Sequence, residues 1–181
     1  MHWTLQADLG YSSLGFGDVT GADFNSMKGF TYRFGVARVK DNWNYGFRYS
    51  VVSGIKVDPF YLSSGETGSF SVEYQRMHFT TGYSYPFIQA LFILGVETSK
   101  WKGSPEPGQK TAQDSQFGFE VSHNFFDPLD TTPSYKITTP LSIQVLSLSK
   151  RTVTFDNYPK DSIVAKGGIA YDITMGVAIE F

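Results

Sequence analysis

The sequence predicts an all-β fold, an eight-stranded antiparallel up-and-down transmembrane β-barrel that occupies residues 1–181 as a single domain. Three observations lead to this prediction. Apolar and polar residues alternate with a period of two along most of the chain, as in strands. Long and short connections follow one another, as in a barrel that crosses a membrane repeatedly. Aromatic residues make up 17% of the chain and charged residues 18%, so the apolar faces are large.

Eight strands follow from the alternation. Their approximate ranges are 3–12, 30–37, 43–51, 70–79, 88–98, 116–122, 141–148 and 171–181. The second and third form a hairpin around the polar turn 40–42. The apolar phase shifts at Met77 in the fourth strand and at Leu146 in the seventh, as β-bulges would cause. Pro140 favours a seventh strand that begins at about residue 141 or contains a bulge, because proline cannot donate to a sheet.

The connections differ in length in a regular way. The predicted long connections are residues 16–29, 53–68, 99–114 and 150–165, and the shorter ones are 40–42, 83–87 and 124–134. In outer-membrane barrels the short turns face the periplasm and the long loops face outward. The sequence therefore predicts short periplasmic turns, long extracellular loops and both termini at the periplasmic end.

Composition excludes several other classes of protein. A chain that is 41% hydrophobic with a net charge of -2 is neither disordered nor attractive to nucleic acid. Cysteine is absent, so there is no disulfide, thiolate metal site or cysteine nucleophile. No apolar run reaches the roughly 18 residues of a membrane-spanning helix, since the densest stretch, 85–96, is shorter.

The alternation alone does not say which face of the barrel is outside. A soluble lipocalin-like carrier would turn its apolar face inward around a ligand. The apolar face here consists mostly of Trp, Tyr, Phe, Ile, Leu and Val, which are too bulky for the interior of an eight-stranded barrel. The opposite face is small and polar. We therefore expect the apolar face to meet lipid, with the soluble carrier as the rival interpretation.

Aromatic residues gather near the short-turn end of the predicted barrel. Membrane barrels carry such girdles where the lipid meets water. The predicted girdle consists of Trp3, Trp43, Tyr83, Tyr85, Phe126 and Phe181.

The last strand, 171–181, ends in Phe181, and the first, 3–11, opens with Trp3. In these features and in architecture the chain resembles the small eight-stranded outer-membrane barrels, a group that includes the OmpA transmembrane domain, OmpX and OmpW. The resemblance implies a multi-pass protein of the Gram-negative outer membrane whose partners are membrane lipid, lipopolysaccharide and the barrel-assembly machinery. It also implies an assembly signal formed by Tyr171, Ile173, Met175, Val177, Ile179 and Phe181. Functions vary within the group, so the resemblance indicates location more than task.

The inward phase carries charged residues at middle depths of the barrel. The predicted lumen network consists of Asp8, Arg33, Arg48, Glu73, Glu120 and Asp172. Buried charges need partners of opposite sign, and groups of this size fill an eight-stranded interior. We therefore expect a plugged lumen rather than a path for protons or ions.

Four apolar residues share this inward phase: Leu91, Ile93, Leu146 and Leu148. One interpretation is packing within the lumen. The alternative, which the resemblance to OmpW implies, is a narrow channel for small hydrophobic solutes.

The residues offer little for catalysis. His2, His78 and His123 are all expected toward the periplasmic end, whereas a lipid A-modifying enzyme acts at the outer leaflet. Ser122 and His123, with Asp127 as a possible third member, form a weak lead. We expect no catalytic residues, no metal site and no cofactor.

Basic residues lie where the predicted strands emerge into the long loops. The candidates for contacts with lipopolysaccharide phosphates are Lys100, Lys102, Lys150, Arg151 and Lys166. Because the long loops hold aromatic and basic residues that a barrel does not require, we hypothesise that they act in surface recognition, adhesion or envelope integrity, with a host or cell-surface partner.

Overall fold

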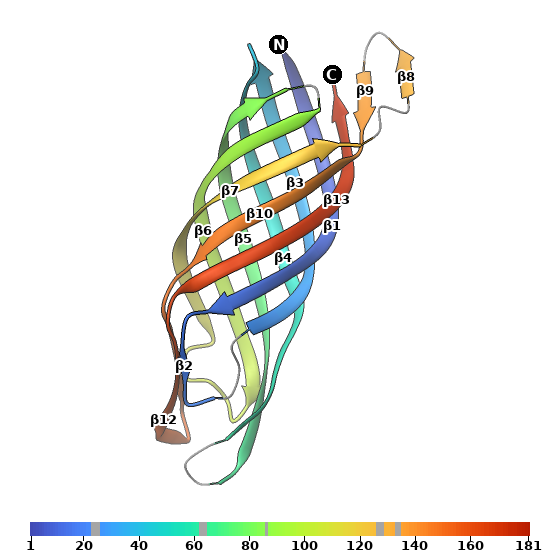
Figure 1. Ribbon diagram of the computed structural model, residues 1–181. Coiled ribbons are helices and arrows are strands. Elements are labelled where there is room, and N and C mark those ends of the chain that lie inside the picture. The colour runs from blue at the N-terminus through green and yellow to red at the C-terminus, as the bar shows by residue number, and fades with distance from the viewer. Residues whose placement is uncertain (23–25, 62–64, 86, 126–128, 133–134) are drawn as a thin grey trace.

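A closed antiparallel wall of eight strands forms the body of this computed structural model, which describes residues 1–22, 26–61, 65–85, 87–125, 129–132 and 135–181 (Figure 1). The wall strands are β1 (His2–Phe16), β3 (Ser26–Lys40), β4 (Trp43–Tyr61), β5 (Thr67–Ser84), β6 (Ile88–Ser104), β7 (Thr111–Asn124), β10 (Pro140–Leu148) and β13 (Gly168–Glu180). Each pairs with the next, and β1 pairs with β13 from Thr4↔Glu180 to Phe16↔Gly168. The predicted fold class is confirmed.

Both termini lie at the end that carries the shorter connections, the periplasmic end of an outer-membrane barrel (Figure 1). Asp41 and Asn42 join β3 to β4 with φ angles of 52° and 66°, the left-handed conformation of a tight two-residue hairpin turn. The predicted hairpin turn is therefore confirmed. At the same end β8 (Leu129–Thr132) and β9 (Tyr135–Thr138) form a small hairpin, in which β9 pairs with the last residues of β13.

At the opposite end the predicted long loops are largely strand, so those loop boundaries were wrong. The predicted loop 53–68 belongs mostly to the wall, because β4 continues to Tyr61 and β5 begins at Thr67. β2 (Val19–Thr20), β11 (Arg151–Phe155) and β12 (Tyr158–Ala165) form a separate sheet in the order β11-β12-β2.

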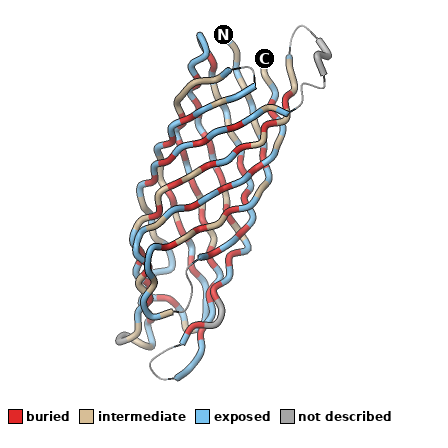
Figure 2. The backbone as a smooth tube through the Cα atoms, in the orientation of Figure 1, coloured by how far each residue is buried: buried red, intermediate tan, exposed pale blue. Residues whose placement is uncertain are grey.

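Buried and exposed residues alternate along the wall strands (Figure 2). The exposed set is strongly apolar over the middle of the barrel; Phe34 is 61% exposed and Phe119 is 62% exposed. Water would not stabilise such a continuous apolar surface, whereas lipid does. Among the described residues no helix is long and apolar enough to cross a membrane.

The two predicted phase shifts are not bulges. β5 alternates without interruption from Gly68 to Thr80, and β10 pairs in continuous register with both β7 and β13. The wall is instead irregular in β4, between Val52 and Ile55, where Gly54 adopts a φ of 76°. Pro140 is the first residue of β10, where its missing N–H is tolerated.

Candidate functional site

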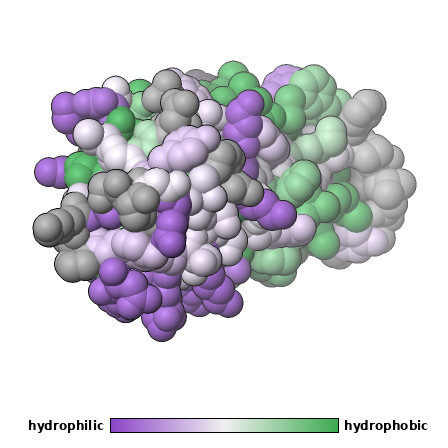
Figure 3. Space-filling view, turned by 90° about the horizontal axis from the view of Figure 1, so that it is seen from below, coloured by the Kyte–Doolittle hydropathy of each residue, from purple (hydrophilic) through white to green (hydrophobic). Residues whose placement is uncertain are grey.

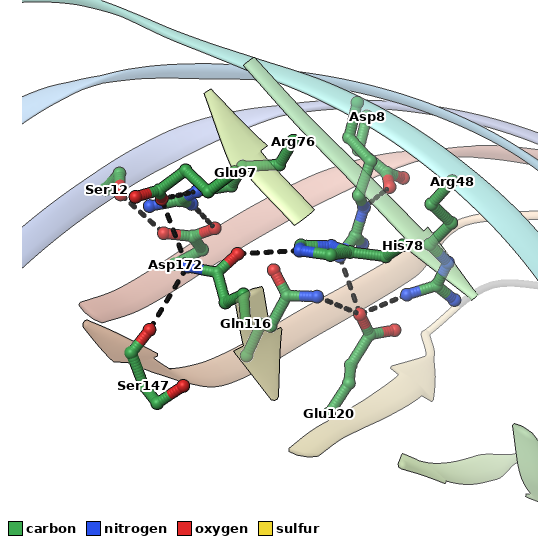
Figure 4. Close-up of polar contacts among 12 residues, drawn as sticks. Asp8, Ser12, Arg48, Arg76, His78, Glu97, Gln116, Glu120, Ser147 and Asp172 are labelled. Carbon is green, nitrogen blue, oxygen red and sulfur yellow. Dashed lines mark hydrogen bonds and ion pairs between the residues drawn. The ribbon is translucent and has the colours of Figure 1, made fainter. Parts of the chain in front are cut away.

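The lumen carries a buried ionic cluster near the middle of the barrel (Figure 4). Arg33 on β3 donates from Nε to Asp8 on β1 at 2.5 Å and from Nη1 to Glu120 on β7 at 2.6 Å. Arg48 on β4 also donates to Glu120. All four side chains are almost fully buried, so each charge needs these partners. Asp8 and Arg33 lie on paired strands, whereas the two pairs to Glu120 join β7 to β3 and β4 across the interior.

A second ionic cluster includes Arg76, Glu97 and Asp172 (Figure 4). Arg76 on β5 donates to Glu97 on β6 at 2.7 Å and to Asp172 on β13 at 2.8 Å. Arg151, at the start of β11, reaches into the wall and pairs with Glu97 at 2.5 Å and with Asp114 at 3.1 Å. This cluster ties four wall strands to the root of the β11–β12 hairpin.

Neutral polar groups complete the network between the charges. His78 Nε2 lies 2.7 Å from Gln116 Oε1, and Gln116 Nε2 donates to Glu97 at 3.0 Å. Ser12 donates to Asp172 at 2.5 Å. The interior is therefore crossed by hydrogen bonds as well as ion pairs. His78 faces the lumen within this network, in the half of β5 nearer the periplasmic end.

The predicted network includes one residue that lies outside the lumen, and it lacks three buried charged residues of the observed network. Glu73 is half-buried on the outer face of β5, where it accepts a hydrogen bond from Gln75 at 2.9 Å, so its assignment to the lumen was wrong. Arg76, Glu97 and Arg151 take part, and the sequence analysis did not include them. Uninterrupted alternation in β5 would have placed Arg76 inside and Glu73 outside.

Above the ionic clusters the lumen is apolar and tightly packed. The rings of Phe60 and Phe70 stack with centroids 4.6 Å apart, and Phe155 stacks on both at 5.4 and 5.6 Å. Trp101 meets Phe70 edge-on at 5.9 Å. We call this group, with the other members of the same buried cluster, the mouth cluster. Those other members are Leu14, Phe16, Met27, Val52, Ile55, Val57, Val72, Tyr74, Ile93, Leu146, Leu148, Val153, Ile163, Ala165 and Ala170.

The β11–β12 hairpin folds over the extracellular mouth and contributes Val153, Phe155 and Ile163 to the mouth cluster. The connection between β6 and β7 holds the hairpin from the other side, since Gly108 donates its N–H to the Thr154 carbonyl at 2.9 Å. Both ends of the hairpin are also tied down, through Arg151 and through the pairing of Ala165 with Val19. At the extracellular end the described side chains of the hairpin therefore pack against those of the wall.

The periplasmic end is open by comparison. A cavity of about 200 Å³ opens between the strand ends there and is lined by hydroxyl, amide and charged side chains, among them His2, Gln6, Gln89, Asn124 and Glu180. Gln6, which lines this vestibule, donates hydrogen bonds at 3.0 Å to Asp8 of the ionic cluster. The vestibule is therefore linked to the charged interior of the barrel.

The predicted aromatic girdle lies near the periplasmic rim. Trp3, Trp43, Tyr85 and Phe181 are exposed, and Tyr83 packs edge-on against Trp43 with centroids 5.9 Å apart. Phe126 lies outside the described residues. The side chains of the terminal strand proposed as an assembly signal all face outward; they are Tyr171, Ile173, Met175, Val177, Ile179 and Phe181.

The predicted lipopolysaccharide contacts separate into two groups. Lys100, Lys102 and Lys150 are exposed, whereas Arg151 is buried in the lumen network, so its assignment to the surface was wrong. Arg151 is the first residue of β11, and its side chain is held inward by its ion pairs with Glu97 and Asp114. Lys166 is exposed but forms an ion pair with Asp18 at 2.9 Å, which raises the pKa of Lys166 and lowers that of Asp18.

The geometry does not support a catalytic group formed by Ser122, His123 and Asp127. Ser122 and His123 are neighbours on β7, so Ser122 faces the lumen and His123 faces outward, where its ring meets Phe125. Asp127 lies outside the described residues. Among the residues that the structure describes, no group of three or more His, Asp or Glu side chains is placed to hold a metal ion.

Comparison with known proteins identifies the fold. No known protein family and no curated protein matches the sequence. Neisserial surface protein A is similar in structure, with a TM-score of 0.54 and 12% identity over 99% of this chain and 97% of that chain. A major outer membrane protein from Thermus thermophilus has a TM-score of 0.51 and 13% identity over 97% of this chain and 99% of that chain.

A third similar structure is Ail, the attachment invasion locus protein of Yersinia pestis, with a TM-score of 0.49 and 14% identity over all of both chains. Identities this low show shared fold only. Together with the apolar outer belt, the fold is that of the small bacterial outer-membrane barrels, and the chain is an outer-membrane protein.

Proposed function

We propose that this protein is a non-conducting outer-membrane barrel that acts through its extracellular end, by recognition of molecules at the cell surface. The observation that carries the proposal is the closure of the lumen. The mouth cluster fills the extracellular end, and two ionic clusters cross the interior below it. An eight-stranded wall has little space to spare, so these groups leave no continuous path for solutes.

The alternative of a channel for small hydrophobic solutes rested on four inward apolar residues. Ile93, Leu146 and Leu148 belong to the closed mouth cluster, where they contact other side chains instead of lining a passage. Leu91 is also buried, but it sits on the same strand face as Glu97 and close in height to the ionic interior. An apolar solute would meet charged groups below the mouth, which disfavours this path.

Catalysis is not part of the proposal, because the described serine and histidine candidates face opposite sides of the wall. Recognition fits the extracellular end better. Wall strands continue beyond the lipid belt there, and this end of the molecule is predominantly hydrophilic in surface view (Figure 3). Partners of the proposed surface are lipopolysaccharide in the same leaflet and a host or other cell-surface molecule.

Two measurements test the proposal together. In planar bilayers the purified protein should give no large, stable conductance. In a knockout strain, a variant shortened in the extracellular connections 21–25 and 62–66 should lose adhesion or serum survival while uptake of a small apolar compound is unchanged.

The matched control is a variant shortened at the opposite end, in the periplasmic connection 126–134. It should keep the wild-type phenotype. A stable conducting state, or loss of solute uptake with adhesion and serum survival intact, would contradict recognition and favour transport.

A further inference from the structure

The outer face of the wall is hollowed where β4, β5 and β6 rise above the lipid belt. Two adjoining hollows of about 330 and 380 Å³ share Lys56, Ser71 and Lys102. Lys100 and Glu73 line the first hollow, and Ser69 and Gly103 line the second. We call this surface the lysine trough. Small residues line much of it beside the lysines, among them Ser53, Gly54 and Ser71.

Strand register brings the lysines together. Lys56 on β4 is paired with Ser71 on β5, and Ser71 is paired with Lys102 on β6, so two lysines flank one serine in a single row. Their backbones are about 10 Å apart, two strand spacings, which two lysine side chains can bridge around one phosphate. Lys100 joins from the next row, opposite Glu73.

These lysines are an unneutralised group of cations. Among the described residues, none of Lys56, Lys100 and Lys102 forms an ion pair with a carboxylate, and Glu73 accepts instead from Gln75. Two other cations at this end are paired: Lys110 with Glu106 at 2.5 Å and Lys166 with Asp18 at 2.9 Å. Three free cations on a hollowed surface favour a polyanionic ligand.

The position of the trough identifies the ligand's source. Val96 is the last outward apolar residue of β6, and Lys100 and Lys102 follow four and six residues later. With strand rise and tilt, they stand about 10 and 15 Å beyond the apolar belt, at the height of lipid headgroups. The trough also faces sideways, on the wall rather than the tip, so its neighbour is a molecule in the same leaflet.

We infer that the lysine trough binds the phosphorylated headgroup sugars of the outer-leaflet glycolipid, lipopolysaccharide, in the plane of the membrane. Serine hydroxyls on the floor suit sugar and phosphate oxygens, and the three ammonium groups suit phosphates. This inference rests on the proposed function, because it names one ligand of the extracellular surface.

The test compares ligand binding by the intact barrel in phosphatidylcholine nanodiscs. The triple variant Lys56→Gln, Lys100→Gln, Lys102→Gln should bind purified lipopolysaccharide about 100-fold more weakly than the wild type, since each lysine near an anionic surface contributes about fivefold. The charge-matched control Lys110→Gln, Lys150→Gln, Lys166→Gln should stay within about twofold, because those side chains lie outside the trough.

Further binding measurements with other ligands test whether the trough recognises the phosphates of lipopolysaccharide or any anion. Dephosphorylated lipopolysaccharide should bind the wild type as weakly as lipopolysaccharide binds the triple variant, and inorganic phosphate should compete only at far higher concentration. Equal loss in both triple variants would overturn the inference, as would a sulfated polysaccharide or free phosphate that binds the trough at least as tightly as lipopolysaccharide. The two claims can also be told apart. If the triple variant loses lipopolysaccharide binding but keeps adhesion, and only the loop-shortened variant loses adhesion, then the trough binds lipopolysaccharide independently of the recognition function.

Discussion

The two halves of strand β5 have opposite polarity. In the half within the membrane, Met77 and Phe79 face outward, and Arg76 and His78 face the lumen. In the extracellular half the outward residues are polar, and Phe70, Val72 and Tyr74 face inward. Side chains alternate between the two faces without interruption along the whole strand. The polarity inverts because lipid surrounds one half of the strand and water surrounds the other.

This inversion divides the barrel into two kinds of interior. The membrane half has a polar interior that must satisfy its charges with ion pairs, because lipid takes the apolar side chains. The extracellular half is built like a small soluble β-protein, with an apolar core and a polar surface. The second interior seals the first from outside, and this division underlies the proposed closed lumen.

The sharpest way to break the comparison is to place a charge in the apolar half. Val72→Glu buries an unpaired carboxylate in the mouth cluster, where Val72 is 2% exposed. An uncompensated buried charge costs at least several kcal/mol, roughly enough to prevent folding. Refolding yield, read from the heat-dependent gel shift of the barrel, checks this.

Its matched control moves polarity the other way on the adjacent residue. Glu73→Val removes a charge from the watery face and should change the free energy of unfolding by only about 0.5 kcal/mol. If the barrel tolerates Val72→Glu but not Glu73→Val, then Glu73 faces the lumen and Val72 faces outward, which would contradict the comparison.

The polar half should depend on its ion pairs. Arg76→Met removes the ion-pair partner of Asp172 and leaves Glu97 with Arg151 alone, and removal of one partner from a buried pair costs about 3 to 5 kcal/mol. Urea unfolding in lipid vesicles measures the loss. Arg38→Met, at an exposed arginine beside Trp3, is the control and should cost less than about 1 kcal/mol. Equal losses would mean that the lumen network contributes little.

Identical substitutions on the two sides of the wall should differ in a smaller way. Ile55→Val removes a methyl group from the mouth cluster and should cost about 0.5 to 1.5 kcal/mol. Ile173→Val removes the same group from the lipid-facing side, where Ile173 is 53% exposed and lipid fills the space, so it should cost clearly less. Urea unfolding of both variants in the same lipid measures the loss in the free energy of unfolding. A larger loss for Ile173→Val than for Ile55→Val would argue against a tightly packed mouth cluster.

The smallest effect is expected at the surface pair Asp18 and Lys166. Lys166 donates a hydrogen bond to Asp18 and lowers the pKa of that carboxyl, so the pair stabilises the fold above the ordinary carboxyl pKa and loses this contribution as the pH falls through the lowered one. Because both groups are exposed, the change in stability should be barely measurable. NMR titration of Asp18 should show its pKa rise toward the ordinary value in Lys166→Gln. An unchanged pKa would mean that Asp18 and Lys166 do not form this ion pair in solution.

The fold could be predicted because lipid imposes a simple rule on the membrane half. Alternation, the tight turn at Asp41 and Asn42 and the outward terminal strand all follow from that rule, and they agree with the structure. The extracellular half could not be read in the same way. There the apolar set moves to the inner face, so the inversion between Tyr74 and Met77 looked like a bulge and the continued strands looked like loops.

The same cause explains which lumen residues were found. Asp8, Arg33, Arg48, Glu120 and Asp172 lie in the membrane halves of their strands, where the apolar residues face outward, so periodicity alone placed them inward. Glu73 lies on the extracellular side of the inversion in β5 and was therefore assigned to the lumen, whereas Arg76, on the membrane side, was not assigned. Arg151 had no such signal, because only the folding of the β11–β12 hairpin over the mouth brings it to Glu97.

Cysteine labelling along β5 tests the inversion most directly, and the chain contains no cysteine of its own. Single variants Phe70→Cys, Ser71→Cys, Val72→Cys, Glu73→Cys and Met77→Cys would be treated with a water-soluble maleimide in intact vesicles. The account predicts rapid labelling at 71 and 73, and protection at 70 and 72 by the mouth cluster and at 77 by lipid. Rapid labelling at 70 and 72 with protection at 71 and 73 would contradict it.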